Sequence, residues 1–443
     1  MKRYLWIFAV LPFLWSCIAE DSSACPQPRG VSVRMSVCPD PMTAVTHAAD
    51  EEAIRDLNLY LLDADRNVVL HRYQSSPTLR FECLPGDYLL RIAANMGRDT
   101  GDSPAWENLA VTHADDYDML PMAYEGEVSI PSSDETIVLP TVEVQRVVAK
   151  VTYNISVAPD AGDIRLHSVQ PVNLPARVPV FDPGLRAAEY TAGEIVGSSS
   201  QTLTGTFYML PNLQGEVPSI ADQRDKGPAN APADATFLRI RALRGSKVLD
   251  YYIYPGGNNT SNFDIRANTH YRLDIMIRGD AEVDTRIRAY TVEVLCTPEA
   301  ALSNGFLLER QPMRLTLRLG GAYEEAGVEA FVELKTGDVR YFGFEGQWGA
   351  VARPMEIRGP ENDYDIRYWP PSFTREECRF MFRVHILDRY GEVASFGFPY
   401  CYAHLLHQMV RRQQRERHCR LARCATCGRR HDALFMVFAH ILS

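Results

Sequence analysis

The chain has 443 residues and a formal net charge of −10, with 46% hydrophobic and 23% charged residues. This length allows two or three domains, and the composition is that of a chain that folds around apolar cores. The charge is uneven, because residues 401–443 hold eight Arg and only Glu416 and Asp432 as acidic residues. The rest of the chain is therefore strongly acidic, which excludes nucleic acid as the expected partner, since phosphate binding needs a basic face.

Residues 1–16 have the layout of a secretory signal. A positive start, Met1-Lys2-Arg3, precedes an apolar run over 4–15 and the small residue Ser16. The apolar run is shorter than the roughly 20 residues of a transmembrane helix. Cys17 follows at the position that a bacterial lipobox gives to its acylated cysteine. We therefore predict a lipoprotein signal peptide over 1–16, a lipidated N-terminus at Cys17 and a polar leash over 17–30. An ordinary signal peptide followed by a chance cysteine is the alternative.

Alternating apolar and polar residues predict β-strands along most of the chain. Residues 31–37 alternate strictly, and turn-forming residues separate several other strand-like runs. The longest run, 147–157, places its apolar residues on one face, so we expect a central strand there and a candidate accepting edge at 31–37. The other expected strands cover 57–62, 68–73, both halves of 78–96, 313–319 and both halves of 380–393, and one short helical turn is expected within 47–56.

The fold class is predicted to be all-β. Dense antiparallel strands without long helices are typical of β-sandwiches. We expect an N-terminal β-sandwich over 31–158, a second β-sandwich over 159–285 and a third β-rich, Ig-like domain over 286–400. The tail over 401–443 is rich in Arg and Cys, lacks a strand period and is expected to be irregular and disordered.

Five segments together resemble the FimB/Mfa-type fimbrial anchor and accessory subunit family of Bacteroidales, which belongs to type V pili. They occur in the family's order over roughly residues 14–285. The segments are SCIAEDSSACP (16–26), LPGDYLLRIAAN (84–95), PMAYEGEVSI leading into VEVQRVVAKVTYNISV (121–157), FYMLPNLQG (207–215) and YYIYPGGNNTSNFDIRANTHYRLDIMIRG (251–279). Pro211 and Pro255 depart from the family pattern, and the third domain and the tail extend beyond it.

The resemblance implies two tandem transthyretin-like β-sandwiches and a non-enzymatic role in a surface fimbria. A protein of this kind would be held in the outer membrane by lipid on Cys17 and would need no other cofactor. Its partners would be other fimbrial subunits, joined by β-strand addition to an open sheet edge. Anchoring or capping the fimbria is the expected role. A tip or adhesin-like protein that binds a host or glycan ligand through the third domain is the alternative.

The tail contains the one metal-like pattern of the sequence. Cys and His at these spacings can close a tetrahedral zinc site, and the candidate ligands are Cys419, Cys424, Cys427 and His431, next to His418. An Arg-dense surrounding favours a tail without a metal, so a zinc-binding protein is the third and least favoured class of function.

Other candidate sites have a simpler structural interpretation. The chain has no G-x-S-x-G motif and its eleven His are scattered, so no catalytic residues are predicted. The segment 256–264 has the residues of a calcium or sugar loop, but Gly and Asn favour a β-turn there. Four aromatic residues of the third domain could face a glycan, although core or edge positions are favoured: Trp348, Tyr364, Tyr368 and Trp369. Export permits disulfides, and spacing alone does not fix their pairing. Several of the remaining cysteines lie on apolar strand faces, however, so buried free thiols are expected.

Overall fold

The computed structural model describes residues 29–40, 49–102, 104–198, 200–280, 284, 286–298, 306–307, 312–368 and 378–402. These residues form strands almost throughout, and their only α-helix is the four-residue α1 (Tyr323–Ala326). The all-β prediction is confirmed. Within the described part of the chain no helix has the length and apolar character needed to cross a membrane. The chain divides into two compact units, here called unit 1 and unit 2, which are described separately.

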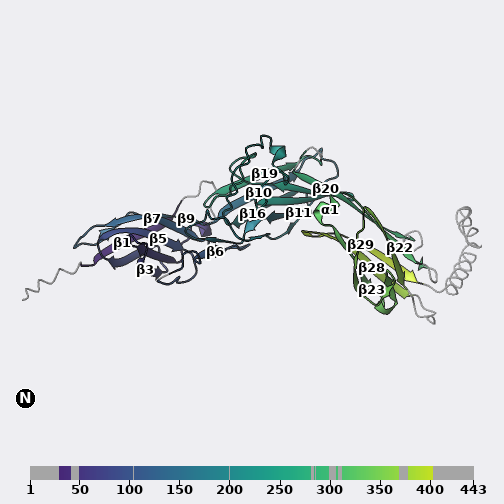
Figure 1. The fold of residues 1–443 in the computed structure, drawn as a ribbon, viewed down its shortest axis with the longest axis horizontal. Coiled ribbons are helices and arrows are strands. Elements are labelled where there is room, and N and C mark those ends of the chain that lie inside the picture. The colour runs from purple at the N-terminus through teal and green to yellow at the C-terminus, as the bar shows by residue number, and fades with distance from the viewer. Residues whose placement is uncertain are drawn as a thin grey trace, which may run out of the picture. The chain divides into compact units, whose positions relative to one another are not determined.

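Unit 1 contains the residues up to Ala149 together with 177–185 and 266–270. Figure 1 draws its strands in purple and blue and labels several of them. Its elements are β1 (Val31–Pro39), η1 (Ala49–Glu52), β2 (Leu57–Leu62), β3 (Val68–Gln74), β4 (Thr78–Cys83), β5 (Gly86–Ala94), β6 (Ala110–Thr112), β7 (Met122–Ile130), β8 (Ile137–Val138), β9 (Val142–Arg146) and β13 (Arg177–Pro179).

The strands of unit 1 follow the order β3-β2-β5-β7-β9-β1-β4, with β8 also paired to β1. The turn at Pro85 carries the chain from β4, beside β1, to β5, beside β2 and β7. Strand β1 buries Val31, Val33, Met35 and Val37 on one face. It pairs with β4 on one side and with β8 and β9 on the other. The expectation of an accepting edge at 31–37 is therefore wrong, because both sides of this strand are occupied.

Unit 2 contains the rest of the described chain. Its elements are β10 (Ala149–Val157), β11 (Arg165–Val172), β12 (Leu174–Pro175), β14 (Tyr190–Thr191), β15 (Val196–Gly197), β16 (Thr202–Met209), η2 (Gln223–Asp225), β17 (Phe237–Arg244), β18 (Lys247–Ile253), β19 (His270–Ile277), β20 (Ile287–Thr297), β21 (Phe306–Leu307), β22 (Met313–Gly321), α1, β23 (Glu329–Thr336), η3 (Val339–Tyr341), β24 (Phe342–Phe344), β25 (Gln347–Trp348), β26 (Ala352–Met355), β27 (Glu361–Tyr368), β28 (Cys378–Asp388) and β29 (Gly391–Tyr402).

Strand β10 is the middle strand of the three-stranded sheet β16-β10-β19. This confirms the expectation that 147–157 forms a central strand. The sequence assigned the strand to the N-terminal sandwich, whereas all but its first residue belong to unit 2. Its buried side chains, including Tyr153 and Ile155, share a core with apolar residues of β11, β17 and β18.

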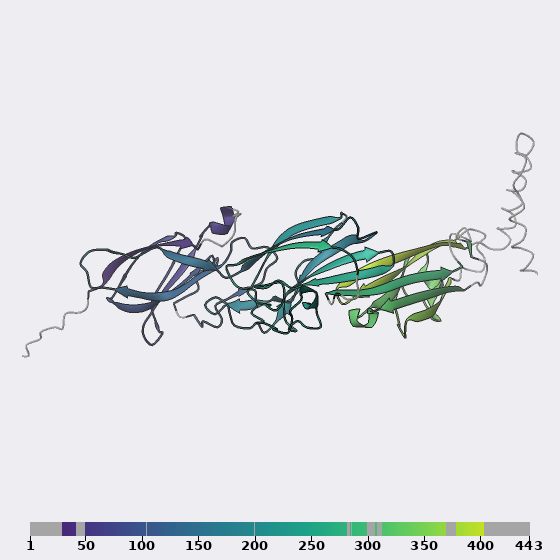
Figure 2. The ribbon, with the colours of Figure 1, turned by 90° about the horizontal axis from the view of Figure 1, so that it is seen from above.

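One nine-stranded sheet runs through unit 2 in the order β15-β11-β17-β18-β20-β22-β27-β24-β25. Strand β20 makes the sheet continuous, because its first half pairs with β18 and its second half pairs with β22. The expected domain boundary at 285/286 thus lies just before β20, a strand that two sandwiches share. Figure 2 shows these two sandwiches of unit 2 in teal and green.

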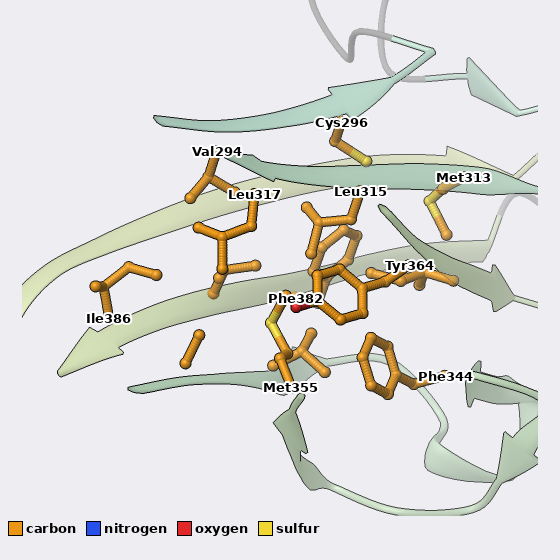
Figure 3. Close-up of a cluster of buried hydrophobic side chains, with 14 of the residues drawn as sticks. Val294, Cys296, Met313, Leu315, Leu317, Phe344, Met355, Tyr364, Phe382 and Ile386 are labelled. Atoms are coloured by element: carbon orange, nitrogen blue, oxygen red, sulfur yellow. The ribbon is translucent and has the colours of Figure 1, made fainter. Parts of the chain in front are cut away.

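The C-terminal half of unit 2 is a β-sandwich. Its second layer is the sheet β21-β29-β28-β23-β26, and side chains from both sheets meet in one core. Figure 3 shows side chains of β20 and β22, such as Val294 and Leu317, pointing toward Phe382 and Ile386 of β28. Burial of apolar side chains on both faces stabilises this part of the chain, at about 25 cal/mol per Å² of apolar surface.

Candidate functional site

The candidate site is a groove in unit 1, between two strands that diverge. Strands β7 and β8–β9 are consecutive arms of one hairpin, joined through residues 131–136. Within the part of the chain that the structure describes, the two arms pair only at Met122↔Arg146 and Ala123↔Gln145. Beyond these two pairs they separate around a cavity of about 620 Å³, which we call the unit 1 groove.

Both walls of the groove are strand edges. The far side of β7 pairs with β5 along its whole length, and the far sides of β8 and β9 pair with β1. Among the described residues, no strand pairs with the facing edges at 124–130 and 137–144. An unpaired edge presents a row of backbone N–H and C=O groups that can bind another strand. The groove is therefore open to an extended segment on two sides at once.

The floor of the groove is apolar. Met35, Leu90 and Val180 line it and are buried. Val128 and Val142 are half-buried on opposite walls. Because Met35, Leu90 and Val180 are already buried, an inserted segment would cover mainly the half-buried Val128 and Val142, and it would need apolar residues on its inner face to do so.

The rim of the groove is acidic. Four carboxylates line it, namely Asp40, Glu125, Glu127 and Glu143. Burial, followed by the charges of Glu143 and Asp40, raises the pKa of the neighbouring Cys38 thiol. The Cys38 thiol therefore stays protonated at neutral pH and is a poor nucleophile.

Two of the four carboxylates already have partners. Glu125 pairs with Arg91 at 2.6 Å, and the Arg91 guanidinium also lies 4.4 Å from the ring centre of Trp106. Asp40 accepts a hydrogen bond of 2.9 Å from the side-chain amide of Asn268. Within the described chain, Glu127 and Glu143 have no such cationic or amide partner. They stand on opposite walls of the groove and are both exposed.

Arg146 fixes the closed end of the groove. Its side chain is almost fully buried and donates hydrogen bonds to the carbonyl oxygens of Glu51, at 3.0 Å, and Asp40, at 2.9 Å. It also contacts Asn268 Oδ1 at 3.3 Å. Through its hydrogen bond to the carbonyl oxygen of Asp40, Arg146 holds the chain after β1 against β9.

The predicted lipid and zinc sites lie outside the described residues. This holds for Cys17 and for Cys419, Cys424, Cys427 and His431. Lipidation and zinc binding therefore stay predictions. Within the residues that the structure describes, no group of acidic, His and Cys side chains is arranged to hold a metal. Free thiols there are Cys38, Cys83 and Cys296. Of these three, only Cys296 is buried, whereas Cys38 and Cys83 are half-buried, so the expectation of buried thiols is confirmed for Cys296 alone.

The segment 256–264 is a turn built around a lysine. The ammonium group of Lys226 donates to the carbonyl oxygens of Asn258 and Asn262, at 2.8 and 2.7 Å, and lies 4.9 Å from the ring centre of Phe263. Asn262 Oδ1 accepts from the backbone of Gly257 and Asp264. A cation already occupies the carbonyl oxygens that a calcium ion would use, which supports the β-turn interpretation.

The three described aromatic residues among those considered for a glycan surface do not share one exposed face. Tyr364 and Tyr368 are buried in the core of the C-terminal sandwich, as the favoured interpretation expected. Trp348 is 43% exposed on β25, and Trp369 lies outside the described residues.

Sequence reasoning missed the groove. It placed 121–130 within a family motif without predicting a strand there, and the motif does not reveal which edge of β7 stays unpaired. The available signal was Pro140, which interrupts 137–146 and produces two short strands, β8 and β9. A proline has no N–H to donate, so it marks a place where a strand cannot be paired on both sides.

Comparisons with known proteins found one family model and several solved structures that are similar to parts of the chain. Residues 207–275 match a family model described as a domain of unknown function, DUF4906. No curated protein matches the chain. The tip fimbrial protein Mfa3 of Porphyromonas gingivalis is similar in structure, with 15% identity, coverage of 59% of this chain and 98% of that chain, and a TM-score of 0.43.

Two further solved structures from Porphyromonas gingivalis are similar. The fimbrilin FimA has 12% identity, covers 58% of this chain and 95% of its own, and has a TM-score of 0.39. The fimbrial anchor protein Mfa2 has 9% identity, covers 48% of this chain and 78% of its own, and has a TM-score of 0.28.

Proposed function

We propose that the chain is a non-enzymatic, lipid-anchored fimbrial subunit that anchors or caps a surface fimbria by accepting a strand of a partner subunit. The unit 1 groove is the observation that carries this proposal, because it combines two strand edges with an apolar floor. The five ordered sequence motifs support the fimbrial context, and two of them, 84–95 and 121–157, supply β5, β7 and β9 around the groove.

Strand addition fits the chemistry of the groove. A strand laid between β7 and β8–β9 would pair with the backbone groups of both edges and bring apolar side chains onto the half-buried Val128 and Val142. Backbone hydrogen bonds give affinity in this type of binding, and the alternating side-chain pockets fix the register. Filling the groove would also remove two edges on which the protein could otherwise aggregate.

Lipid on Cys17 would hold the subunit at the outer membrane. Each buried methylene contributes about 0.8 kcal/mol, so two or more acyl chains anchor a protein stably. The polar residues 18–30 would then separate the membrane from β1, which begins at Val31.

The proposed function is tested by blocking the groove. Thr141 lines the groove and is exposed, so Thr141→Trp fills the space without disturbing the core. Ser32→Trp is the matched control, because Ser32 is exposed on the central strand β1 and lies away from the groove lining. Tagged variants are expressed in the bacterium that carries the chain, and co-purifying fimbrial subunits are identified.

Thr141→Trp should fold with an unchanged melting temperature and lose its fimbrial partners, whereas Ser32→Trp should keep both. If both variants join fimbriae as the unaltered chain does, the groove is not the accepting site. If fimbriae of normal length and attachment form when the protein is deleted, the fimbrial role is wrong.

A tip or adhesin role is the second candidate. Trp348 and Val351 favour it, because they are 43% and 56% exposed near the β24–β25 hairpin. Exposed aromatic and apolar side chains that lie close together are typical of a contact surface. Loss of binding to host cells in Trp348→Ala, with normal incorporation into fimbriae, would support this role over anchoring.

A further inference from the structure

We infer that the unit 1 groove selects a partner strand that carries basic residues on its outward face, between Glu127 and Glu143. This inference rests on the proposed function and names the chemistry of the partner. It is carried by the two carboxylates of the rim that have no partner within the described residues.

The side chains of β7 alternate between the groove floor and the solvent. Tyr124 and Val128 are half-buried, whereas Glu125 and Glu127 are exposed. The opposite wall shows the same pattern, since Glu143 on β9 is exposed. A strand inserted between the walls would alternate in the same way. Its inner residues would cover the apolar floor, and its outer residues would lie between the side chains of the two rims.

The outer face of the inserted strand would meet uncompensated negative charge. Arg91 neutralises Glu125, and Asn268 binds Asp40, so these two carboxylates contribute little to selection. Glu127 and Glu143 remain, one on each wall. Directly opposed side chains on neighbouring strands approach to about 5 Å, where opposite charges attract and like charges repel. The pairs Met122↔Arg146 and Ala123↔Gln145 put Glu143 in register with Glu125 and Glu127 in register with Thr141, so the two carboxylates lie two residues apart along an inserted strand. A Lys or Arg at each of these two outer positions would be attracted by the nearest carboxylate, and an Asp or Glu would be repelled.

The size of the preference follows from two such cross-strand pairs. Each pair contributes modestly at an exposed position, so we expect a strand with basic outer residues to bind about tenfold more tightly than its acidic counterpart. Salt should weaken the preference, because exposed charges are screened over about 10 Å at 0.1 M ionic strength. Repulsion of acidic strands would give specificity beyond that of the backbone hydrogen bonds.

The test uses the full chain and synthetic peptides of about the length of β7, which has nine residues. One peptide alternates valine with arginine, a second alternates valine with glutamate and a third alternates valine with glutamine. Alternation places the test residue on the outer face in either orientation of the peptide. Dissociation constants are measured by fluorescence anisotropy at low and at high salt.

The arginine peptide should bind the unaltered chain about tenfold more tightly than the glutamate peptide. The double variant Glu127→Lys/Glu143→Lys should reverse this order, since both positions are exposed and the fold does not depend on them. Glu82→Lys, an exposed carboxylate on β4 outside the groove lining, should leave the order unchanged. Equal binding of all three peptides, or an unchanged order in the double variant, overturns the inference.

Thr141→Trp separates the inference from the proposed function. If it abolishes binding of peptides that all bind equally, the groove accepts strands and only the selection by charge is wrong. If the peptides bind Thr141→Trp as tightly as they bind the unaltered chain, or if none binds the unaltered chain, strand acceptance by the groove fails as well.

A peptide of this chain's own basic residues 403–443 is included. If it binds the groove more tightly than the arginine peptide, the occupant is the chain's own segment and the assignment to a partner is overturned.

Discussion

Arg241 of β17 and Asp388 at the end of β28 form a buried ion pair, with side-chain exposures of 2% and 0%. Arg241 also donates two hydrogen bonds of 2.9 Å to the carboxylate of Asp250 on β18. The hydroxyl of Tyr290 donates to Asp388 at 2.9 Å. The pair therefore joins the β28–β29 turn of the C-terminal sandwich to two strands of the preceding sandwich within unit 2.

Replacing Asp388 with Ala should destabilise unit 2. The substitution leaves Arg241 with one carboxylate instead of two and removes the acceptor of Tyr290. Breaking a buried ion pair by removing one partner costs about 3–5 kcal/mol. The free energy of unfolding, measured by urea denaturation, should fall by an amount in this range.

An exposed ion pair provides the control for Asp388→Ala. Arg340 and Asp338 pair at the surface, where such interactions contribute between about 0 and 1 kcal/mol. Arg340→Ala removes this pair and keeps the Asp338 side chain that caps η3, so it should change the unfolding free energy far less. Equal effects of the two substitutions would show that the buried pair does not hold the turn in place.

Replacing Val151 with Asp should unfold unit 2 and leave unit 1 folded. Val151 is fully buried in β10, and an unpaired buried charge costs several kcal/mol. Hydrogen exchange measured by mass spectrometry should show lost protection in β11, β17 and β18, with β1 and β5 still protected. Asn154→Ser, at an exposed position of the same strand, should keep the protection of both units. Loss of protection confined to unit 1 would contradict the assignment of β10.

The stability contribution of Lys226 should rise with pH. Burial lowers the pKa of Lys226 to about 8, from the ordinary value of 10.5. The unfolded chain thus binds more protons than the folded chain between these two pH values, so folding becomes more favourable as the pH rises. Comparing the pH dependence of the unfolding free energy with that of Lys226→Met isolates the contribution of this residue, because the two proteins share all their other titrating groups.

The unfolding free energy of the unaltered chain, minus that of Lys226→Met, should increase from pH 8 to about 10.5. One pKa unit corresponds to about 1.4 kcal/mol, so the increase is on the order of 3 kcal/mol at most. A difference that stays flat over this range would show that the Lys226 ammonium is fully compensated by the carbonyl oxygens of Asn258 and Asn262.

The sequence was informative where one residue pattern determines one structural outcome. Period-two alternation identified β1, and turn residues located the β2–β3 and β28–β29 hairpins. Pairing between distant strands is not encoded in such patterns. The alternation of 31–37 is the same for an edge strand and a central one, so the position of β1 between β4 and β9 could not be predicted. The continuity of β20 across two sandwiches and the divergence of β7 from β9 are equally non-local.

Replacing Cys17 with Ala tests the predicted anchor. If Cys17 carries the lipid, the variant should leave the outer-membrane fraction, and the unaltered protein should show a mass increase from acyl chains at its mature N-terminus. Ser16→Gly keeps a small residue before the cysteine and should remain anchored. Retention of Cys17→Ala in the outer membrane with unchanged processing would contradict the lipoprotein prediction.

Truncation of the tail should be tolerated only beyond Tyr402. The sequence placed the start of the tail at 401, but β29 continues to Tyr402. Cys401 and Tyr402 pair with Arg379 and Cys378 of β28 and also with β21. A chain that ends at Tyr402 keeps these pairs and should unfold within about 1–2 °C of the full-length protein. A chain that ends at Tyr400 loses these pairs and should unfold several degrees lower, because about 1 kcal/mol shifts the melting temperature by 2–4 °C in a domain of 150–250 residues.

Differential scanning calorimetry distinguishes the two truncated chains, and metal analysis of the full chain tests the zinc ligands in the same preparation. A large loss of stability on truncation after Tyr402, accompanied by loss of bound zinc, would show that residues 403–443 form a structural metal module.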